Sequence, residues 1–409
     1  MKRQIFIIGG GPAGMMAAIT AAREGVDVTI LEHNDRIGKK ILSTGNGRCN
    51  FTNVNQSSKY YRSDNKGFAW RAVERFPVED TVKFFEELGI YAKNKNGGLY
   101  PFSEQASAVL DVLRMEVERL NIHVITGSNV SDLKSGKKGF QILCKDHSYK
   151  ADAVILATGS KAAPKLGSDG SGYTLAKKLG HSMIPVVPAL VQLRCKESFY
   201  KALAGVRLQG KVRLMVNGKE VASDTGEIQL TDYGISGIPV FQVSRFASRA
   251  IYEKKKVEAV LDFMPELSTI EFCEFIMKRI KNRPEKYMED FFTGLLNKKV
   301  SQVVLKIANI RNNQKAGILN KDEINRIIRT VKEFRTEVTE ANSFDQAQIC
   351  AGGINTREIN PETMESLMVK NLYFAGEIMD VDGICGGYNL QWAWSSGYLA
   401  GKGAAYAKN

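Results

Sequence analysis

The feature that most constrains this chain is a glycine-rich turn between an apolar run and an alanine-rich segment near its beginning. Lys2–Ile8 predicts a β-strand, and the stretch GGGPAG at 9–14 follows it with the spacing G-x-G-x-x-G. Met15–Glu24 predicts a helix that ends at Gly25, and Val26–Leu31 predicts a second strand. In this order of strand, glycine turn, helix and strand, the spacing indicates a dinucleotide-binding fold.

Four positions carry the expected nucleotide contacts. Gly9 permits the tight turn, Gly11 lets the backbone approach a pyrophosphate at the positive end of the helix, and Gly14 permits close packing of helix on strand. Glu32 lies 18 residues after Gly14, at the end of the second strand. A carboxylate there accepts hydrogen bonds from ribose hydroxyls and disfavours a 2′-phosphate. The alternative is a surface glutamate that follows an ordinary glycine turn.

Two later strand ends repeat the pattern of a buried strand followed by glycine. Asp152–Leu156 leads into ATG at 157–159, which predicts a return to the first nucleotide turn, although an ordinary strand exit has the same sequence. Asn371–Ala375 leads into GE at 376–377, and GGYNLQ at 386–391 opens a final helix rich in alanine and glycine. The glycine pair favours a second approach of backbone N–H groups to a cofactor. The alternative is a helix that only packs closely.

Composition limits the class of protein. The chain has 409 residues, of which 44% are hydrophobic and 25% charged, a balance typical of globular proteins. No apolar run reaches the roughly 18 residues of a membrane span, and the start does not predict a signal peptide, so we expect a cytoplasmic protein with no membrane partner. Six scattered cysteines without C-x-x-C and four histidines predict no metal site. The net charge of +13 is spread along the chain, which disfavours a nucleic-acid partner.

The pattern of hydrophobic residues changes twice in the middle of the sequence, which predicts an insertion. Residues 191–265 contain short alternating runs and an Asn217-Gly218 pair, both typical of β-hairpins. Residues 266–348 show helical periodicity instead. We therefore expect an α/β, Rossmann-like domain made of residues 1–190 and 349–409, interrupted by a β-rich subdomain (191–265) and a small helical subdomain (266–348).

Together, the three glycine motifs resemble those of FAD-binding oxidoreductases of the glutathione-reductase structural class. A more specific resemblance lies in IGKKILSTGNGRCN at 37–50, with GSDGSGY at 167–173, PALV at 188–191 and GGI at 352–354. These motifs resemble those of the BaiN/YhiN-like flavoproteins, and the resemblance extends over nearly the whole chain, including the insertion. The resemblance implies an FAD-binding domain with inserted β-rich and helical domains.

The resemblance also implies where FAD binds. It implies that Gly11, Ala13 and Gly14 hold the pyrophosphate, Glu32 the adenosine ribose, and the backbone of Val130 the adenine. The flavin and its ribityl chain are expected to lie among Lys39 or Lys40, Asn46, Gly47, Arg48, Cys49 and Asn50. The positions expected to complete the site are Thr158, Gly159, Gly376, Glu377, Asn389, Leu390 and Gln391.

For activity, the resemblance implies an FAD-dependent oxidoreductase that acts on a small organic substrate. One form of it points to reduction of a carbon–carbon double bond conjugated to a ketone, as in bile-acid intermediates, with NADH or NADPH as donor. Another points to oxidation of an amine such as aminoacetone, with oxygen as acceptor and hydrogen peroxide as product. The alternatives from other classes are a flavoprotein that interacts with tRNA and a flavin-binding regulator without turnover.

The sequence leaves the catalytic residues open, because a flavin carries the hydride chemistry itself. Arg48 either stabilises negative charge on reduced flavin or binds an anionic substrate, and the alternative is a phosphate or structural contact. Cys49 and Cys385 are expected to be buried structural cysteines, since neither belongs to a C-x-x-C pair. Tyr388 either donates a proton to substrate or packs on the flavin. The oligomeric state is not predicted.

Overall fold

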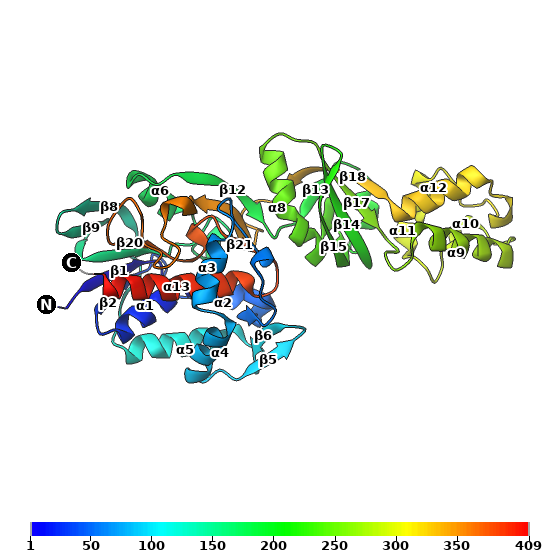
Figure 1. The fold of residues 1–409 in the computed structure, drawn as a ribbon. Coiled ribbons are helices and arrows are strands. Elements are labelled where there is room, and N and C mark those ends of the chain that lie inside the picture. The colour runs from blue at the N-terminus through cyan, green and yellow to red at the C-terminus, as the bar shows by residue number, and fades with distance from the viewer. Residues whose placement is uncertain (1, 408–409) are drawn as a thin grey trace. The chain divides into compact units, whose positions relative to one another are not determined.

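A computed structural model describes residues 2–407. The chain divides into two compact units, the first made of Met1–Val186 with Ile349–Asn409, the second of Val187–Gln348. The first unit is the Rossmann-type α/β domain that the sequence predicts, and the second contains a β-barrel and helices (Figure 1).

The first unit is built on a five-stranded parallel sheet with the strand order β20-β11-β1-β2-β7. In that order the strands are Leu372–Phe374, Ala153–Leu156, Gln4–Ile8, Asp27–Leu31 and His123–Ile125. The central strands are buried on both faces, which explains continuous apolar runs such as QIFII and AVIL in place of alternation. Ile8 pairs with Leu31 on one side and Leu156 on the other, so three strands end at the same level.

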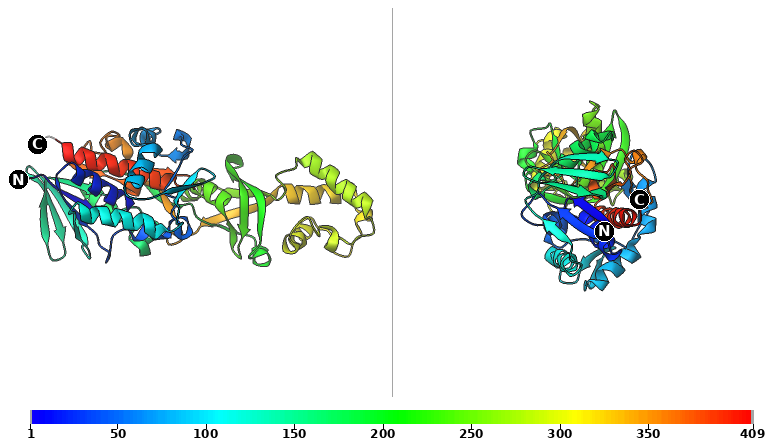
Figure 2. Two further views of the ribbon diagram at one scale, coloured as in Figure 1. Left: turned by 90° about the horizontal axis from the view of Figure 1, so that it is seen from below. Right: turned by 90° about the vertical axis from the view of Figure 1, so that its left-hand side faces the viewer.

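Two helices rich in small residues pack against each other in this unit. Helix α1 is Pro12–Arg23 and helix α13 is Tyr388–Tyr406. A Cβ added at Gly397 or Gly401 would lie 2.5 or 2.4 Å from a backbone carbonyl oxygen of α1. These two glycines, one turn apart, therefore let α13 approach the backbone of α1, and the helices run side by side in both directions of view (Figures 1 and 2).

The remaining elements of the first unit surround this sheet. The helices α4 and α5 are Val78–Glu87 and Ala106–Arg119. A three-stranded antiparallel sheet consists of β8 to β10; its strands are Val130–Gly136, Gly139–Cys144 and Ser148–Ala151. The other elements are α2 (Lys39–Ser43), β3 (Thr52–Asn53), β4 (Tyr61–Arg62), α3 (Phe68–Arg75), β5 (Ala92–Lys95), β6 (Gly98–Pro101), α6 (Ser171–Lys178), β19 (Ile349–Ile354) and β21 (Asp382–Gly383). Strand β12 (Met183–Ala189) begins in the first unit and ends in the second.

The second unit contains a closed six-stranded barrel in the order β13-β16-β15-β14-β17-β18. Its strands are Leu193–Cys195, Gly234–Ser236, Lys219–Leu230, Arg207–Val216, Val257–Asp262 and Phe334–Ala341. The Asn217-Gly218 pair turns the β14–β15 hairpin, with both residues at positive φ as a type I′ turn requires. Its helices are α7 (Tyr200–Leu203), α8 (Ile238–Tyr252), α9 (Thr269–Asn282), α10 (Met288–Phe291), α11 (Lys298–Ile307) and α12 (Lys321–Lys332).

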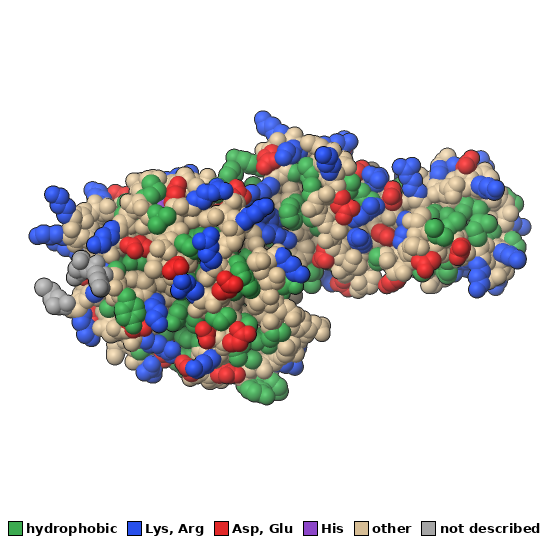
Figure 3. Space-filling model, in the orientation of Figure 1, with side chains coloured by type: hydrophobic (Ala, Val, Ile, Leu, Met, Phe, Trp, Pro, Cys, Tyr) green, Lys and Arg blue, Asp and Glu red, His purple; other side chains and the backbone are tan. Residues whose placement is uncertain are grey.

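The barrel takes its last strand from the segment expected to be helical. Strand β18 pairs with β17 and β13, and one cluster of buried apolar side chains runs through the barrel and the helices. The subdomain boundary at residue 265 therefore stays a prediction. Lys/Arg and Asp/Glu side chains alternate over the visible face without a large patch of one sign (Figure 3). Among residues 2–407, no helix is both long and apolar enough to cross a membrane.

Candidate functional site

The predicted site residues gather at one edge of the parallel sheet. Because all five strands run the same way, their carboxyl ends meet at that edge. Gly9 follows β1, Glu32 follows β2, Thr158 comes soon after β11, and Gly376 comes soon after β20. Ligands of open α/β sheets bind outside the carboxyl ends of the strands, so the topology places the sequence motifs where a dinucleotide belongs.

The first glycine turn leaves space where a pyrophosphate is expected. Gly9 has φ +104°, and a Cβ there would lie 2.5 Å from the Ala157 carbonyl oxygen. A Cβ at Gly14 would lie 1.9 Å from the Gly9 carbonyl oxygen, so only glycine fits either position. A Cβ at Gly11, by contrast, would meet nothing within 4 Å. Gly11 directly precedes α1 as its N-cap residue, and no side chain caps this helix, so the free backbone N–H groups there suit an anion.

Glu32 is buried and held in one orientation, with 6% of its surface exposed. The Gly10 N–H donates to Oε2 at 2.8 Å, and the backbone and side-chain N–H groups of Asn34 donate to Oε1 at 2.9 and 2.7 Å. The loop that leads to Val130 joins the same turn, since the Ser128 N–H donates to the Glu32 carbonyl at 2.9 Å. The positions expected to contact ribose and adenine, Glu32 and Val130, therefore lie near each other.

Two other strand ends meet this turn from the opposite side. Gly376 has φ +76°, and a Cβ there would lie 2.7 Å from the Ala13 Cβ at the start of α1. Two α13 side chains fix Gly376, because its N–H donates to Ser396 Oγ at 2.9 Å and its carbonyl accepts from Trp392 Nε1 at 3.1 Å. Gly159, at φ +72°, also lies where a side chain would collide with a neighbour. Both glycines are thus required by the backbone.

Of the two lysines that the resemblance offers, Lys40 is the one that joins another predicted residue. Lys40 Nζ lies 2.7 Å from Glu377 Oε2, and both side chains are about four-fifths buried. Lys39 Nζ instead pairs with exposed Asp35 at 2.6 Å. The structure therefore brings Lys40 and Glu377 together, whereas Lys39 lies beside Asp35 and Asn34.

The loop of residues 44–50 meets the start of α13. Gly45, Asn46, Gly47 and Cys49 all have positive φ, which folds the loop tightly. A Cβ at Gly387 would lie 2.9 Å from Asn50 Oδ1, so two segments far apart in sequence touch at this point. Asn46 and Gly47 lie on the same loop.

The buried polar atoms at this edge test whether the residues fit FAD. Asn50 Oδ1, Thr158 Oγ1 and Glu377 Oε1 are buried and have no hydrogen-bond partner among the described residues. Buried oxygens of this kind are costly and rare in folded proteins. The three come from three separate segments, and all belong to the residues implied to contact the cofactor. Acceptors of this kind suit ribityl hydroxyls and ring N–H groups, so the set fits FAD.

Two of the expected residues use their side chains inside the protein instead. Gln391 is fully buried; its Nε2 donates to Phe76 O, Thr81 Oγ1 and Ser395 Oγ, while its Oε1 accepts from Thr52. Its side-chain amide therefore stabilises the core, and its contact with the cofactor stays a prediction. The Asn389 side chain likewise bonds to the backbone of Gly383 and Ile384. Leu390 is half-buried beside them.

Cys49, Tyr388 and Arg48 are the side chains considered for catalysis, and their surroundings differ. Burial raises the pKa of the Cys49 thiol to about 11, so it stays protonated, as the structural interpretation expects. The Tyr388 hydroxyl donates to the Asn55 carbonyl at 2.9 Å, and burial raises its pKa to about 12. Its proton is therefore committed to the backbone. Arg48 is half-exposed, and its Nη1 lies 3.8 Å from Glu104 Oε2.

Sequence reasoning missed one part of this edge, the β5–β6 hairpin. It carries Lys93, Lys95 and Tyr100 next to the loop of residues 44–50. Its one local signal is the pair Asn96-Gly97, which turns the hairpin with both residues at positive φ. That pair predicts a hairpin but says nothing about its neighbours.

Comparison with known proteins decides the family. The sequence matches the family described as HI0933-like protein Rossmann domain over residues 3–403. The chain belongs to this family. It is an FAD-dependent oxidoreductase, and the resemblance stated from the motifs is confirmed.

Two curated relatives in this family cover nearly the whole chain. The chain is 45% identical to a 3-dehydro-bile acid delta(4,6)-reductase of Clostridium scindens over 404 residues, 98% of this chain and 99% of that one. It is 30% identical to a ribosomal RNA dihydrouridine synthase of Haemophilus influenzae over 398 residues, 96% of each. Among solved structures, a 3-ketosteroid-delta4-(5alpha)-dehydrogenase from Rhodococcus jostii matches with a TM-score of 0.47 and 15% identity, over 100% of this chain and 97% of that one.

Proposed function

We propose that this member of the HI0933-like family reduces a carbon–carbon double bond conjugated to a carbonyl in a small, steroid-like substrate, with NADH or NADPH as electron donor. The observation that carries the proposal is the 45% identity with a bile-acid delta(4,6)-reductase over nearly the full length of both chains. A substrate of that kind is a ketone whose double bonds are conjugated to it. Its remote carbon accepts a hydride readily, because the carbonyl takes up the charge.

The geometry at the carboxyl edge of the parallel sheet suits a bound FAD and therefore supports this chemistry. FAD, when bound, supplies the hydride. The chain's own residues suit the two ends of the cofactor in different ways. Backbone N–H groups at Gly11 and the Glu32 carboxylate suit the nucleotide, while Lys40, Glu377 and Asn50 suit the flavin end. A fixed cofactor presents its reactive atom to substrate in one geometry.

A second candidate substrate is uridine in RNA. It is favoured by the 30% identity with a ribosomal RNA dihydrouridine synthase over 96% of each chain. The chemistry is closely related, since the double bond that is lost in dihydrouridine is also conjugated to a ring carbonyl. The net charge of +13 is spread along the chain, and the face seen in Figure 3 has no large patch of one sign. This spread argues against an extended contact with phosphates, so the steroid-like substrate is the first choice.

An anaerobic stopped-flow experiment tests the proposal. NADH or NADPH should bleach the flavin absorbance of the purified protein, and a 3-keto-Δ4,6 steroid should then restore it while gaining two hydrogens per reduced bond. Bleaching by an amine but by neither nicotinamide would overturn the proposal in favour of amine oxidation. Restoration by an unmodified ribosomal RNA transcript but not by the steroid would select the second candidate.

A further inference from the structure

Tyr100 is the side chain of the missed hairpin that borders the flavin end of the site. Strand β6 runs antiparallel between β3 and β5. Leu99 is buried on one face of β6, so Gly98 and Tyr100 share the opposite face. A Cβ at Gly98 would lie 2.7 Å from Asn50 Nδ2, and one at Gly45 would lie 3.6 Å from Tyr100 Cε1. The tyrosine ring therefore lies along the loop of residues 44–50.

The surroundings of this phenol carry an excess of positive charge. Lys93 Nζ and Lys95 Nζ contact the Glu104 carboxylate at 2.5 and 2.7 Å, and Arg48 lies 3.8 Å from it. Three cations thus share one carboxylate, and Lys95 Nζ is 5.8 Å from the centre of the Tyr100 ring. A phenolate formed at Tyr100 is stabilised by these charges.

Opposing effects act on the acidity of Tyr100. Partial burial raises its pKa, and the charge of Arg48 lowers it. Cys385, Cys49 and Glu104 also face the phenol and raise its pKa. The group is therefore protonated at neutral pH, with a guanidinium beside it to receive the negative charge when the proton leaves.

The Tyr100 hydroxyl is also free to donate. Within residues 2–407 no hydrogen bond joins it to another residue, and it is half-buried rather than enclosed. The hydroxyls of Tyr388 and Tyr61, by contrast, donate to Asn55 O at 2.9 Å and Gln56 Oε1 at 2.7 Å. Tyr60 has no such bond but packs its ring on Tyr388, 4.9 Å between ring centres, which makes it the matched control.

We propose that Tyr100 donates the proton that completes double-bond reduction, with Arg48 stabilising the phenolate; this rests on the proposed function. A hydride, with its electron pair, forms the C–H bond at the carbon remote from the carbonyl, and the double-bond electrons move onto the carbonyl as an enolate. The Tyr100 O–H bond then breaks, and its proton forms the C–H bond next to the carbonyl. Water returns a proton to the phenolate. The electrons come from the reduced flavin, which a nicotinamide donor has reduced.

The test separates the two half-reactions of Tyr100→Phe under anaerobic conditions. Reduction of the flavin by NADH or NADPH should keep its rate, because no proton is donated to carbon in that step. Reoxidation by the 3-keto-Δ4,6 steroid should slow by about 100-fold or more, while reoxidation by ferricyanide, which needs no carbon protonation, should not change. Tyr60→Phe should leave all three rates unchanged.

A second measurement does not depend on turnover. The ultraviolet difference between the wild-type and Tyr100→Phe proteins, followed against pH, isolates the ionisation of one phenol. Arg48→Met should move that ionisation to higher pH, because a neighbouring positive charge is removed. No movement would show that Arg48 does not stabilise the phenolate and would overturn that part of the proposal.

The outcomes distinguish the two proposals. If the wild-type protein is not reoxidised by the steroid at all, the proposed substrate class fails. If the wild-type protein is reoxidised and Tyr100→Phe matches it, the proton-donor role of Tyr100 is wrong. The same conclusion follows if Tyr60→Phe, and not Tyr100→Phe, slows the steroid step.

Discussion

The candidate FAD site has a nucleotide end and a flavin end, and the two ends are formed by different kinds of groups. At the nucleotide end, the backbone provides most of the expected contacts. Gly11 leaves space for a pyrophosphate, helix α1 begins next to it, and backbone N–H groups hold the Glu32 carboxylate. At the flavin end, side chains dominate, with Lys40 paired to Glu377 and several cations gathered on Glu104. Phosphate and ribose are the same in every dinucleotide, whereas the flavin end must suit one reaction, so the first can be read from spacing and the second cannot.

A substitution in the glycine turn should disrupt the nucleotide end most strongly. Gly14→Ala places a Cβ 1.9 Å from the Gly9 carbonyl oxygen, so we expect protein without bound FAD and a free energy of unfolding lowered by about 1–3 kcal/mol. Flavin absorbance per protein and urea unfolding measure the two effects.

Gly11→Ala is the matched control for this prediction. Its Cβ would meet no protein atom within 4 Å, so stability should be kept while FAD binding weakens. A Gly14→Ala protein that purifies with a full complement of FAD would contradict the assignment of this turn.

A smaller effect at the same end is expected for Glu32→Gln. The amide replaces a buried carboxylate that the Gly10 N–H and Asn34 contact, so the dissociation constant of FAD should rise by about 10- to 100-fold. Fluorescence titration of FAD measures it. Glu118→Gln, at an exposed helix position, should leave the constant unchanged; equal constants for both variants would remove Glu32 from the site.

At the flavin end, substitutions of the adjacent residues Lys39 and Lys40 should differ in their effect on stability. Lys40→Met leaves the partly buried Glu377 carboxylate without its cation, so unfolding should be easier by about 1–3 kcal/mol. Lys39→Met removes a pair with an exposed aspartate and should change stability by about 0.5 kcal/mol or less. A double-mutant cycle with Glu377→Gln measures the coupling, and equal effects of the two lysine variants would contradict the assignment.

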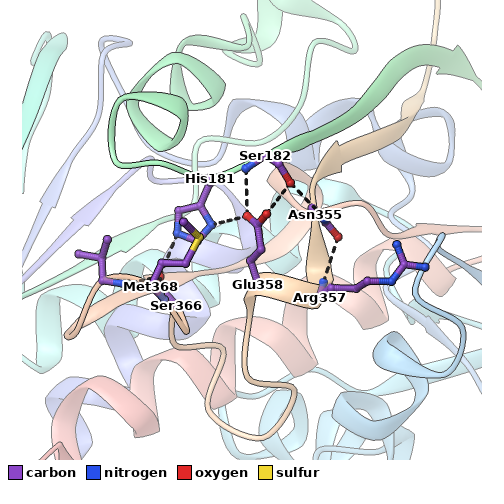
Figure 4. Close-up of polar contacts among 8 residues, drawn as sticks. His181, Ser182, Asn355, Arg357, Glu358, Ser366 and Met368 are labelled. Atoms are coloured by element: carbon purple, nitrogen blue, oxygen red, sulfur yellow. Dashed lines mark hydrogen bonds and ion pairs between the residues drawn. The ribbon is translucent and has the colours of Figure 1, made fainter.

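His181, Glu358 and Ser366 form a polar cluster, for which we expect a small change of stability with pH. His181 Nδ1 lies 3.1 Å from Glu358 Oε2, and His181 Nε2 lies 2.9 Å from Ser366 Oγ (Figure 4). Ser366 Oγ already accepts the N–H groups of Met368 and Val369, so its own proton points to a neutral His181. Ser182 donates to Glu358 as well.

This arrangement predicts how stability changes with pH. Burial lowers the pKa of His181 from 6.5, so the unfolded chain binds the proton more readily and stability falls as the pH drops below about 6.5. The pKa of Glu358 is also lowered from 4.5, since its bonds to Ser182 and His181 outweigh burial, and adds a further loss at lower pH. His181→Asn should flatten the first step in urea unfolding at pH 7 and pH 5.5, whereas His123→Gln, at an exposed position, should not. An unchanged slope in His181→Asn would refute the assignment.

Sequence reasoning reached the fold and the nucleotide end because both depend on local patterns. Strand, glycine turn and helix are consecutive, so Gly11, Gly14 and Glu32 lie where the spacing puts them. The internal hydrogen bonds of the Gln391 side chain could not be predicted, because a polar residue at a helix start looks the same in the sequence whether it faces a ligand or the core.

Tyr100 could not be found in the sequence for a different reason. Its relation to Arg48 and Asn50 arises from a hairpin that pairs with β3, about 50 residues earlier in the chain. Nothing in the pattern of residues 92–101 indicates that pairing. Such contacts are set by tertiary packing rather than by local propensity.

FAD titration of the purified protein, followed by gel filtration and an absorption spectrum, shows whether the edge of the parallel sheet holds FAD. We expect a yellow protein that retains one FAD per chain, and a Gly11→Ala protein that remains folded but retains less. A folded wild-type protein that stays colourless after incubation with FAD would contradict this expectation.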